Sequence, residues 1–454
     1  MKIRHRGFDH FDWLLVALVG ISFLFVDFLP MHPQQLGDMD YTYHTGAKAL
    51  SAAIRGSAPL TYLAITRAPA PVLYYSVPYL LVSPGSSDYT YWRAGLTWTI
   101  AWMIISILAI RRAGELVGGR LAGQLAAMIA VLSPFGVYYS YSIDAEAPAY
   151  VGVALFAYGW AKWQKSDRSS PLLGSAWLAW AGFTMLLLCR LNSLLLLPIA
   201  ALAGGVLWLK GLRREAAFAG TCFAVSAASV LIVVGTLSLL PSRGISPQAS
   251  NLSDILLQGS FQFRTEPGDW RAWTKKTRVG SADYQDWLKQ RADLAVLAKE
   301  SHTSVAKVER DWVLQDAVAH PLSRARAILI RLAAAHIAIV NSVSPQAFKI
   351  GPLKGMGAFV AFHALVNAFT ILNIIGAIWF LVDRRRQLAQ VWPLWGPWAA
   401  LLAFHLMTYI EPRYIFPARP VMAIMAGVAF AAAIQSELRL RAMSVGASRI
   451  AVAQ

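Results

Sequence analysis

The stretch from Phe218 to Leu240, FAGTCFAVSAASVLIVVGTLSLL, holds no charged side chain and decides the class of the protein. As an α-helix it is long enough to cross about 30 Å of hydrocarbon. Its apolar residues are continuous rather than alternating, which favours a helix over a strand of a membrane barrel. The whole chain is 57% hydrophobic and 14% charged, whereas soluble domains are about 25% charged. The sequence therefore predicts an all-α polytopic membrane protein.

The apolar run Trp13–Leu29 follows Lys2, Arg4 and Arg6, as the apolar region of a signal peptide would. The run is longer than such a region and lacks a small-residue cleavage site, so we expect a retained signal-anchor helix. Cys189 and Cys222 lie in apolar runs without Cys/His metal spacing, so we expect no structural disulfide.

Ten apolar runs predict about ten transmembrane helices, and two further apolar stretches set a range of 10–12. The ten runs cover residues 11–29, 90–110, 117–138, 146–163, 172–189, 193–209, 216–240, 356–382, 391–410 and 414–434. The formal net charge of +17 comes mostly from segments between these runs. The positive-inside rule explains the charge without a nucleic-acid partner and places both termini in the cytoplasm of a multi-pass inner-membrane protein. Six basic segments alternate to that side: Lys2/Arg4/Arg6, Arg111/Arg112/Arg120, Lys162/Lys165/Arg168, Lys210/Arg213/Arg214, Arg384/Arg385/Arg386 and Arg439/Arg441/Arg449.

The opposite, periplasmic side receives the clustered acids, so we expect the chemistry there. Three parts follow: an N-terminal transmembrane catalytic module (1–240) that includes the first periplasmic loop (30–89), an insert with an interfacial helix (241–355), and C-terminal transmembrane helices with a cytoplasmic tail (356–454). We expect the insert to be mainly helical, because residues 282–300 have a helical period after a capping Ser281.

Two apolar stretches, Pro69–Val82 and Leu322–Val340, are predicted to be interfacial helices. The first is short and contains three prolines, and the second places Arg324 and Arg331 away from its apolar stripe. Counting either stretch as a span would invert the charge pattern downstream, so both are expected to lie along the membrane. The alternative is one extra pair of spans.

Asp38 and Asp40, in the segment GDMDYTYHTG, are the first catalytic candidates. At the membrane surface one of them would act as general base towards an attacking hydroxyl or amine. The pair would otherwise share a divalent cation with water ligands, or simply cap a helix that begins near Tyr41. No cofactor is expected, and a divalent metal enters only if the Asp-x-Asp pair is a ligand.

Cations near the same predicted face form a candidate site for a lipid phosphate. Their ordinary roles are snorkelling anchors or helix-boundary residues, whereas their convergence would create an anion site. We expect Arg419 to lie inside the last span unless the neighbouring prolines delay the start of that helix. The candidates are Arg67, Arg190, Arg243, Arg413 and Arg419.

Acidic and aromatic residues of the same loops are predicted to line the substrate pocket. Asp144 and Glu146 would alternatively serve only the N-terminus of the next helix, where acids are favourable. The pocket candidates are Tyr43, His44, Tyr74, Asp144, Glu146, Glu411 and Tyr414. The sequence contains no nucleotide-binding loop and no His-Glu-x-x-His motif, so any chemistry must use an activated substrate.

The order of these motifs resembles the GT-C superfamily of membrane glycosyltransferases, in particular protein O-mannosyltransferases and aminoarabinose transferases. Asp38-Met39-Asp40 is followed by Tyr43, Ala47 and Leu50, and then by a basic, proline-rich segment from Arg67 to Tyr75. Later matches are Asp144 after SPFGVYYSYSI, the stretch AHPLSRARAILIRL, and the Arg-Tyr-x-x-Pro-x-x-Pro motif from Arg413 to Pro420.

The resemblance implies an inverting transferase with a GT-C-like helical bundle and a polyprenyl-phosphate-linked sugar donor. An envelope lipid, polysaccharide or protein would be the acceptor. A first-loop Asp would be the base, with Asp40 favoured over Asp38 because it lies nearer Tyr43. Arg67 and the cations near Arg413 would hold the phosphate. The alternatives are a metal-dependent, oligosaccharyltransferase-like or ligase-like enzyme with a diphosphate-linked donor, and a lipid or sugar transporter. The sugar and the acceptor are not specified by the sequence.

Overall fold

The protein is mainly helical in the parts that its computed structural model describes, as the sequence predicts. Those parts are residues 8–27, 38–59, 69–133, 143–166, 172–238, 249–265, 282–336, 349–350, 353–408 and 412–453. Within them the extended structure is one antiparallel pair of two-residue strands, β1 (Lys349–Ile350) and β2 (Leu353–Lys354).

A helix lies at the position of each of the ten expected spans. These helices are α1 (His10–Asp27), α4 (Asp88–Gly118), α5 (Arg120–Leu132), α7 (Glu146–Lys165), α8 (Leu172–Cys189), α9 (Leu196–Leu209), α10 (Arg213–Ser238), α15 (Gly355–Asp383), α16 (Trp392–Met407) and α17 (Arg419–Ala453). Among the described residues, four segments are long and apolar enough to cross a membrane: Asp88–Gly118, Arg213–Val233, Gly355–Asp383 and Tyr414–Ala442. The protein is therefore a multi-pass membrane protein, and the number of about ten spans stays a prediction.

Glycines allow the helices of the bundle to approach closely, as small residues do in membrane proteins. A Cβ atom added to Gly152 of α7 would lie 2.9 Å from the carbonyl oxygen of Gly182 in α8. One added to Gly376 of α15 would lie 2.5 Å from the Cα atom of Ala426 in α17. Larger residues at these positions would push the helices apart.

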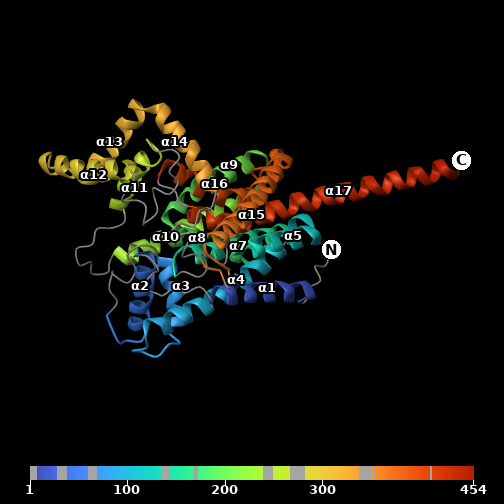
Figure 1. Cartoon of the computed structure of the whole chain (residues 1–454), viewed down its shortest axis with the longest axis horizontal. Coiled ribbons are helices and arrows are strands. Elements are labelled where there is room, and N and C mark those ends of the chain that lie inside the picture. Colours follow the sequence, from blue (N-terminus) through green and yellow to red (C-terminus); the bar gives the residue numbers. More distant parts are fainter. Residues whose placement is uncertain are drawn as a thin grey trace.

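The N-terminal part of α17 is the centre of the bundle. Its residues from Val421 to Ala426 are almost completely buried, and the helix contacts α4, α5, α7, α15 and α16. Its C-terminal part extends away from the bundle towards the right of Figure 1. The beginning of α1 lies on this same side, whereas α2, α3 and α11–α13 lie at the opposite end (Figure 1). The predicted topology requires the beginning of α1 and the C-terminal part of α17 to lie at the same end of the bundle. The assignment of that end to the cytoplasm stays a prediction.

The first loop contains α2 (Asp38–Ile54) and α3 (Pro69–Tyr79), which pack against each other. Arg55 connects their C-terminal ends, because its Nη2 atom donates to the carbonyl oxygens of Tyr79 at 2.8 Å and Val82 at 2.5 Å. α3 is more enclosed than the expected interfacial helix, since α4, α7 and α8 also contact it. Leu73 and Val77 form its exposed apolar stripe, so membrane contact is restricted to one narrow edge.

The described residues of the predicted insert are mainly helical and form α11 (Ala249–Phe261), α12 (Ala282–Glu300), α13 (Val305–Ala319) and α14 (Pro321–Ala334), ahead of the two short strands. The predicted cap Ser281 lies outside the described residues. Asp316 of α13 connects three segments, because it forms ion pairs with Arg264 at 3.1 Å and Arg324 at 2.7 Å.

The sequence analysis placed Arg331 on the outer side of an interfacial helix, and the structure of α14 shows that this placement is wrong. This arginine lies in the protein interior with 1% of its surface exposed, while Leu322 on the same helix is 84% exposed. Its guanidinium donates to the carbonyl oxygens of Leu406 at 2.8 Å, Gln262 at 3.2 Å and Gly259. The carbonyls belong to the C-terminal ends of α16 and α11, where helix dipoles present partial negative charge. Two helix ends therefore compensate this buried cation.

Charges at the other end of the bundle are also paired. Arg111 of α4 is completely buried and bonds Asp9 at 2.6 Å and Asp12. Arg112 bonds the same Asp12 at 2.8 Å and Glu115 at 2.9 Å. The sequence pattern assigns these arginines only to the positive-inside signal, but the structure shows that they also hold α1 against α4.

Candidate functional site

The Asp-x-Asp pair lies at the beginning of a helix. α2 starts at Asp38, three residues before the start near Tyr41 that the sequence predicts. Acidic residues are favourable in a first helical turn, where the dipole is positive. The side chains of Asp38 and Asp40 lie outside what the structure describes, so the choice of base stays a prediction. Helical spacing places Asp40, His44 and Lys48 along one side of α2.

His44 connects this side of α2 to two neighbouring elements. Its Nδ1 atom lies 2.7 Å from the hydroxyl of Tyr79 in α3, and Nε2 lies 3.3 Å from Asp88 at the start of α4. Lys48 also bonds Asp88 and lies 4.9 Å from the centroid of the Tyr91 ring. Burial lowers the pKa of His44, and Asp88 opposes that effect. In the neutral form with a proton on Nε2, the ring accepts from Tyr79 and donates to Asp88.

Sequence reasoning missed Tyr79, Asp88 and Lys48 as neighbours of the predicted pocket residue His44. The available signal was the i, i+4 spacing of His44 and Lys48, two groups that favour an acid partner. It does not identify which of the chain's acids is close, since Asp88 is 40 residues from Lys48.

Helix α3 extends from this cluster towards the second acidic turn. A Cβ atom added to Gly95 of α4 would lie 3.3 Å from Tyr79, 3.4 Å from Tyr75 and 3.4 Å from Ile143. At Gly95, therefore, α3 lies close to Ile143, the residue before Asp144. Tyr74, a predicted pocket residue, is buried with its ring centroid 4.9 Å from that of Tyr75.

The acidic turn and two other loops meet at one place. Asp144 accepts a hydrogen bond from the backbone N–H of Glu146 at 2.8 Å, which supports the N-terminus of α7. The buried Glu146 forms an ion pair with Arg190, between α8 and the 3₁₀ helix η3 (Leu191–Leu195). The Arg190 guanidinium lies 5.0 Å from the centroid of the Tyr414 ring, which stacks on His405 at 4.5 Å. The structure thus brings Arg190, a predicted phosphate ligand, together with Glu146 and Tyr414, two predicted residues of the substrate pocket.

The segment before the last helix positions Arg419 as the first residue of α17. Residues Pro412–Ala418 form the 3₁₀ helix η7, so the proline-rich motif delays the α-helix in the way the sequence analysis considered. Phe416 of η7 stacks on Tyr150 of α7 with ring centroids 4.9 Å apart. The buried Arg419 lines a cavity of about 10 Å³ with Ser133 and Asn373. A cavity of this size holds about one water molecule.

Several predicted site residues stay predictions. Arg67, Arg243 and Glu411 lie outside the described residues, and only the backbone of Arg413 is described, in η7. Tyr43 is buried in α2. Over the parts of the chain described above, no group of three or more His, Cys, Asp or Glu residues is arranged to hold a metal ion.

Comparisons with known proteins identify the fold. No protein-family model matches the sequence, and none of the curated proteins matches it. The crystal structure of the Archaeoglobus fulgidus oligosaccharyltransferase in the apo form is similar, with a TM-score of 0.51 and 14% sequence identity over 95% of this chain. The chain spans 52% of that protein's length. ArnT from Cupriavidus metallidurans bound to undecaprenyl phosphate gives a TM-score of 0.40 at 14% identity, covering 93% of this chain and 60% of the ArnT chain.

The chain therefore has a fold similar to that of this oligosaccharyltransferase, which agrees with the resemblance to membrane glycosyltransferases that the sequence motifs carry. The similarity in sequence is low, so what it establishes is the architecture.

Proposed function

We propose that the protein is an inverting glycosyltransferase of a bacterial inner membrane. It transfers a sugar from a polyprenyl-phosphate donor to an envelope lipid, polysaccharide or protein on the periplasmic side. The observation that carries the proposal is the fold, which extends over 95% of this chain in the comparison with an oligosaccharyltransferase. Glu146, Arg190 and Tyr414 contact one another at the ends of helices, and this convergence supports a site where those helix ends meet.

The base in this reaction is Asp40, with Asp38 as the alternative. The carboxylate accepts the proton of the acceptor hydroxyl or amine while that oxygen or nitrogen attacks the anomeric carbon. The bond from the anomeric carbon to the phosphate oxygen breaks on the opposite face, and its electron pair leaves with the phosphate. The configuration at the anomeric carbon is therefore inverted. His44, one helical turn after Asp40, is held by Tyr79 and Asp88 and fixes this side of α2.

Cations stabilise the phosphate that leaves. We assign this role to Arg190 and Arg419 together with Arg67, Arg243 and Arg413. A preorganised guanidinium stabilises charge that develops on the leaving oxygen, because it does not need to reorient during the reaction. Arg190 is oriented from both sides, by the carboxylate of Glu146 and by the ring of Tyr414. Asp144, Glu411 and Tyr43 complete the proposed pocket.

A metal-dependent enzyme with a diphosphate-linked donor is the second candidate. The similarity to an oligosaccharyltransferase favours it. In that reaction Asp38 and Asp40 would be metal ligands, and a bound divalent cation would supply charge neutralisation for the diphosphate. The two candidates therefore assign different chemical roles to the same carboxylates.

The test compares Asp38→Asn, Asp40→Asn and the double variant in cells that lack the native gene. Mass spectrometry of envelope glycolipids, glycans and proteins measures the transferred sugar. We expect the double variant to lose transfer while Asp286→Asn, a change of an exposed acid in α12, retains it. Normal transfer by the double variant, at equal protein level, contradicts the proposal.

Isolated membranes then separate the alternatives. Activity that persists in EDTA supports the monophosphate donor, and activity that EDTA abolishes and Mg²⁺ or Mn²⁺ restores supports the metal-dependent enzyme. A chain that moves a lipid-linked sugar across reconstituted vesicles without forming a glycosidic bond is a transporter.

A further inference from the structure

Helices α9 and α10 form a hairpin with a tight basic turn. Gly211 has a φ angle of +72°, which glycine adopts readily. Its N–H donates to the carbonyl of Trp208 at 2.9 Å, and the N–H of Leu212 donates to that of Leu207 at 2.9 Å. These bonds end α9 and allow α10 to begin at Arg213, so the two helices run back along each other.

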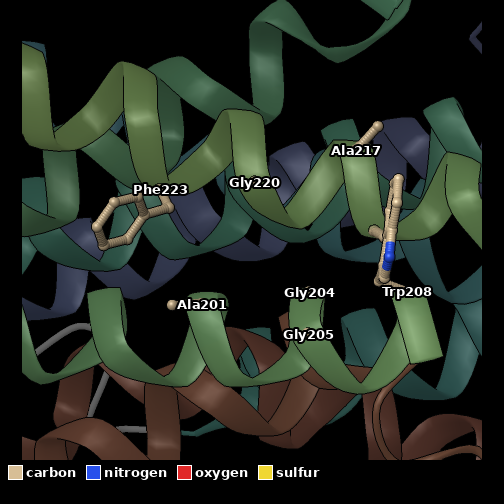
Figure 2. A pocket seen from close by; sticks show the side chains of 8 residues that line it. Ala201, Gly204, Gly205, Trp208, Ala217, Gly220 and Phe223 are labelled. Carbon is tan, nitrogen blue, oxygen red and sulfur yellow. The ribbon is translucent and has the colours of Figure 1, made fainter.

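An apolar groove of about 400 Å³ lies between these two helices. Its α9 side consists of Ala201, Gly204, Gly205 and Trp208, and its α10 side includes Gly220 and Phe223. Figure 2 shows Phe223 near one end of the groove and the Trp208 ring near the other, with the glycines between them. The groove exists because these positions lack side chains: a Cβ atom added to Gly205 or Gly220 would meet nothing within 4 Å.

Exposed apolar side chains lie on both helices of the hairpin. Leu202 of α9 is 70% exposed and Leu231 of α10 is 72% exposed. Leu209, beside the turn, is 86% exposed. Such a surface is unfavourable in water and is expected where a helix faces lipid. A hydrocarbon chain of a bilayer lipid therefore matches the apolar lining of the groove.

Two cations lie at the Trp208 end of the groove. Lys210 and Arg213 are exposed, and the guanidinium of Arg213 lies 5.9 Å from the centroid of the Trp208 ring. The next residue, Arg214, interacts with the protein itself, because it donates to the hydroxyl of Ser166 at 2.9 Å and lies over the Trp163 ring. Lys210 and Arg213 consequently present positive charge at the end of an apolar groove, which is the arrangement that an anionic lipid complements.

We propose that this hairpin is a binding site for an anionic phospholipid. One acyl chain lies between α9 and α10 over Gly205 and Gly220, and the phosphate lies against Lys210 and Arg213. The site is separate from the proposed transfer reaction, since it uses none of the residues assigned to that reaction. The chain fills space that no side chain occupies, and its dispersion contacts with the groove supply affinity that a headgroup alone would lack.

The test uses the full-length chain, delipidated in detergent and titrated with phosphatidylglycerol or phosphatidylcholine of identical acyl chains. Native mass spectrometry counts the lipids that remain bound and reports the oligomeric state. We expect tighter binding of phosphatidylglycerol. Lys210→Gln and Arg213→Gln should each reduce that affinity about fivefold, from the typical attraction of one cation to an anionic lipid surface. Arg385→Gln, an exposed cation in η6 (Arg385–Gln387), is the matched control.

Variants that fill the groove distinguish binding at this specific site from general electrostatic attraction between cations and anionic headgroups. Gly205→Leu and Gly220→Leu place a side chain in open space and should abolish the preference for phosphatidylglycerol. Gly235→Leu in α10, where an added Cβ atom also meets nothing within 4 Å, should preserve it. Equal binding of the two lipids, or glycine variants that bind like the native chain, overturns the proposal. A dimer that the glycine variants disrupt also overturns it, because the groove would then be an interface between two copies.

Discussion

Replacing Arg331 with Met tests whether two helix ends stabilise a buried cation. The change keeps an unbranched side chain of similar length and removes the donors to the carbonyls of Gly259, Gln262 and Leu406. Hydrogen bonds from a charged group contribute about 1.5–3 kcal/mol each. Three such bonds exceed the several kcal/mol that burial of one charge costs. The Met variant leaves these three buried carbonyl oxygens without a donor, at a cost of about 1–3 kcal/mol each, so we expect a net loss of about 3–5 kcal/mol.

The assay is thermal unfolding of the detergent-solubilised chain, followed by size-exclusion chromatography after heating. At about 2 °C per kcal/mol, the value for larger domains, the midpoint should fall by about 6–10 °C. Arg326→Met is the matched control, because Arg326 is an exposed residue of the same helix. We expect that control to unfold within about 1 °C of the native chain, since exposed substitutions rarely change stability.

The Arg331→Lys variant distinguishes charge from geometry. A lysine retains the positive charge but has one ammonium group, which cannot reproduce the fork of donors that reaches two helix ends. It should therefore unfold between the native chain and Arg331→Met. If Arg331→Met is as stable as the native chain, the carbonyls do not depend on the guanidinium and the reasoning is wrong.

Three further predictions use the same unfolding assay. Gly259→Ala should destabilise the chain by about 1–3 kcal/mol, because its Cβ atom would lie 2.6 Å from the backbone of Thr408; an unchanged midpoint contradicts that close approach. Burial lowers the pKa of His44, so the unfolded chain takes up a proton below about pH 6.5 that the folded chain resists, and stability falls as the pH drops below 6.5. His44→Gln should remove that part of the pH dependence, and an identical profile for both proteins refutes the assignment. Asp12→Asn should cost about 1.5–3 kcal/mol, because the buried Arg111 loses a charged partner; a midpoint equal to that of the native chain shows that the other acids suffice.

The helical fold was predictable because bilayer-length apolar runs leave few alternatives. The run from Phe218 to Leu240 corresponds to most of α10, and the cytoplasmic placement of both termini stays a prediction. The span count is harder to read from a sequence, because helices such as α5 (Arg120–Leu132) are shorter than the apolar runs that contain them.

The environment of Arg331 could not be predicted from helical periodicity. Placing arginine on the outer side of an amphipathic helix assumes that cations seek water or headgroups. The structure instead compensates Arg331 with carbonyls 72 and 75 residues away in the sequence. Nothing local in the stretch AILIRLAA identifies those partners, because they depend on where α11 and α16 end.

The candidate site was predictable in part for a related reason. The sequence placed Glu146, Arg190 and Tyr414 in loops on one predicted face, and the structure shows them in contact. Topology assigns residues to a face but does not determine their partners, so the sequence treated Arg190 as a phosphate ligand without indicating its ion pair with Glu146. The same limit explains why the contacts of His44 with Tyr79 and Asp88 were missed.

The position of Arg331 has a consequence for the order in which the chain assembles. The insert helices α11 and α14 are synthesised well before Leu406, the α16 residue that accepts from Arg331. Until α16 emerges and inserts, this guanidinium has only the end of α11 as a partner and keeps part of its hydration shell. Final docking of the insert must therefore wait for the late helices. A ribosome-stalled chain that ends before residue 392 should retain a protease-sensitive insert, even though all of its own helices are already made.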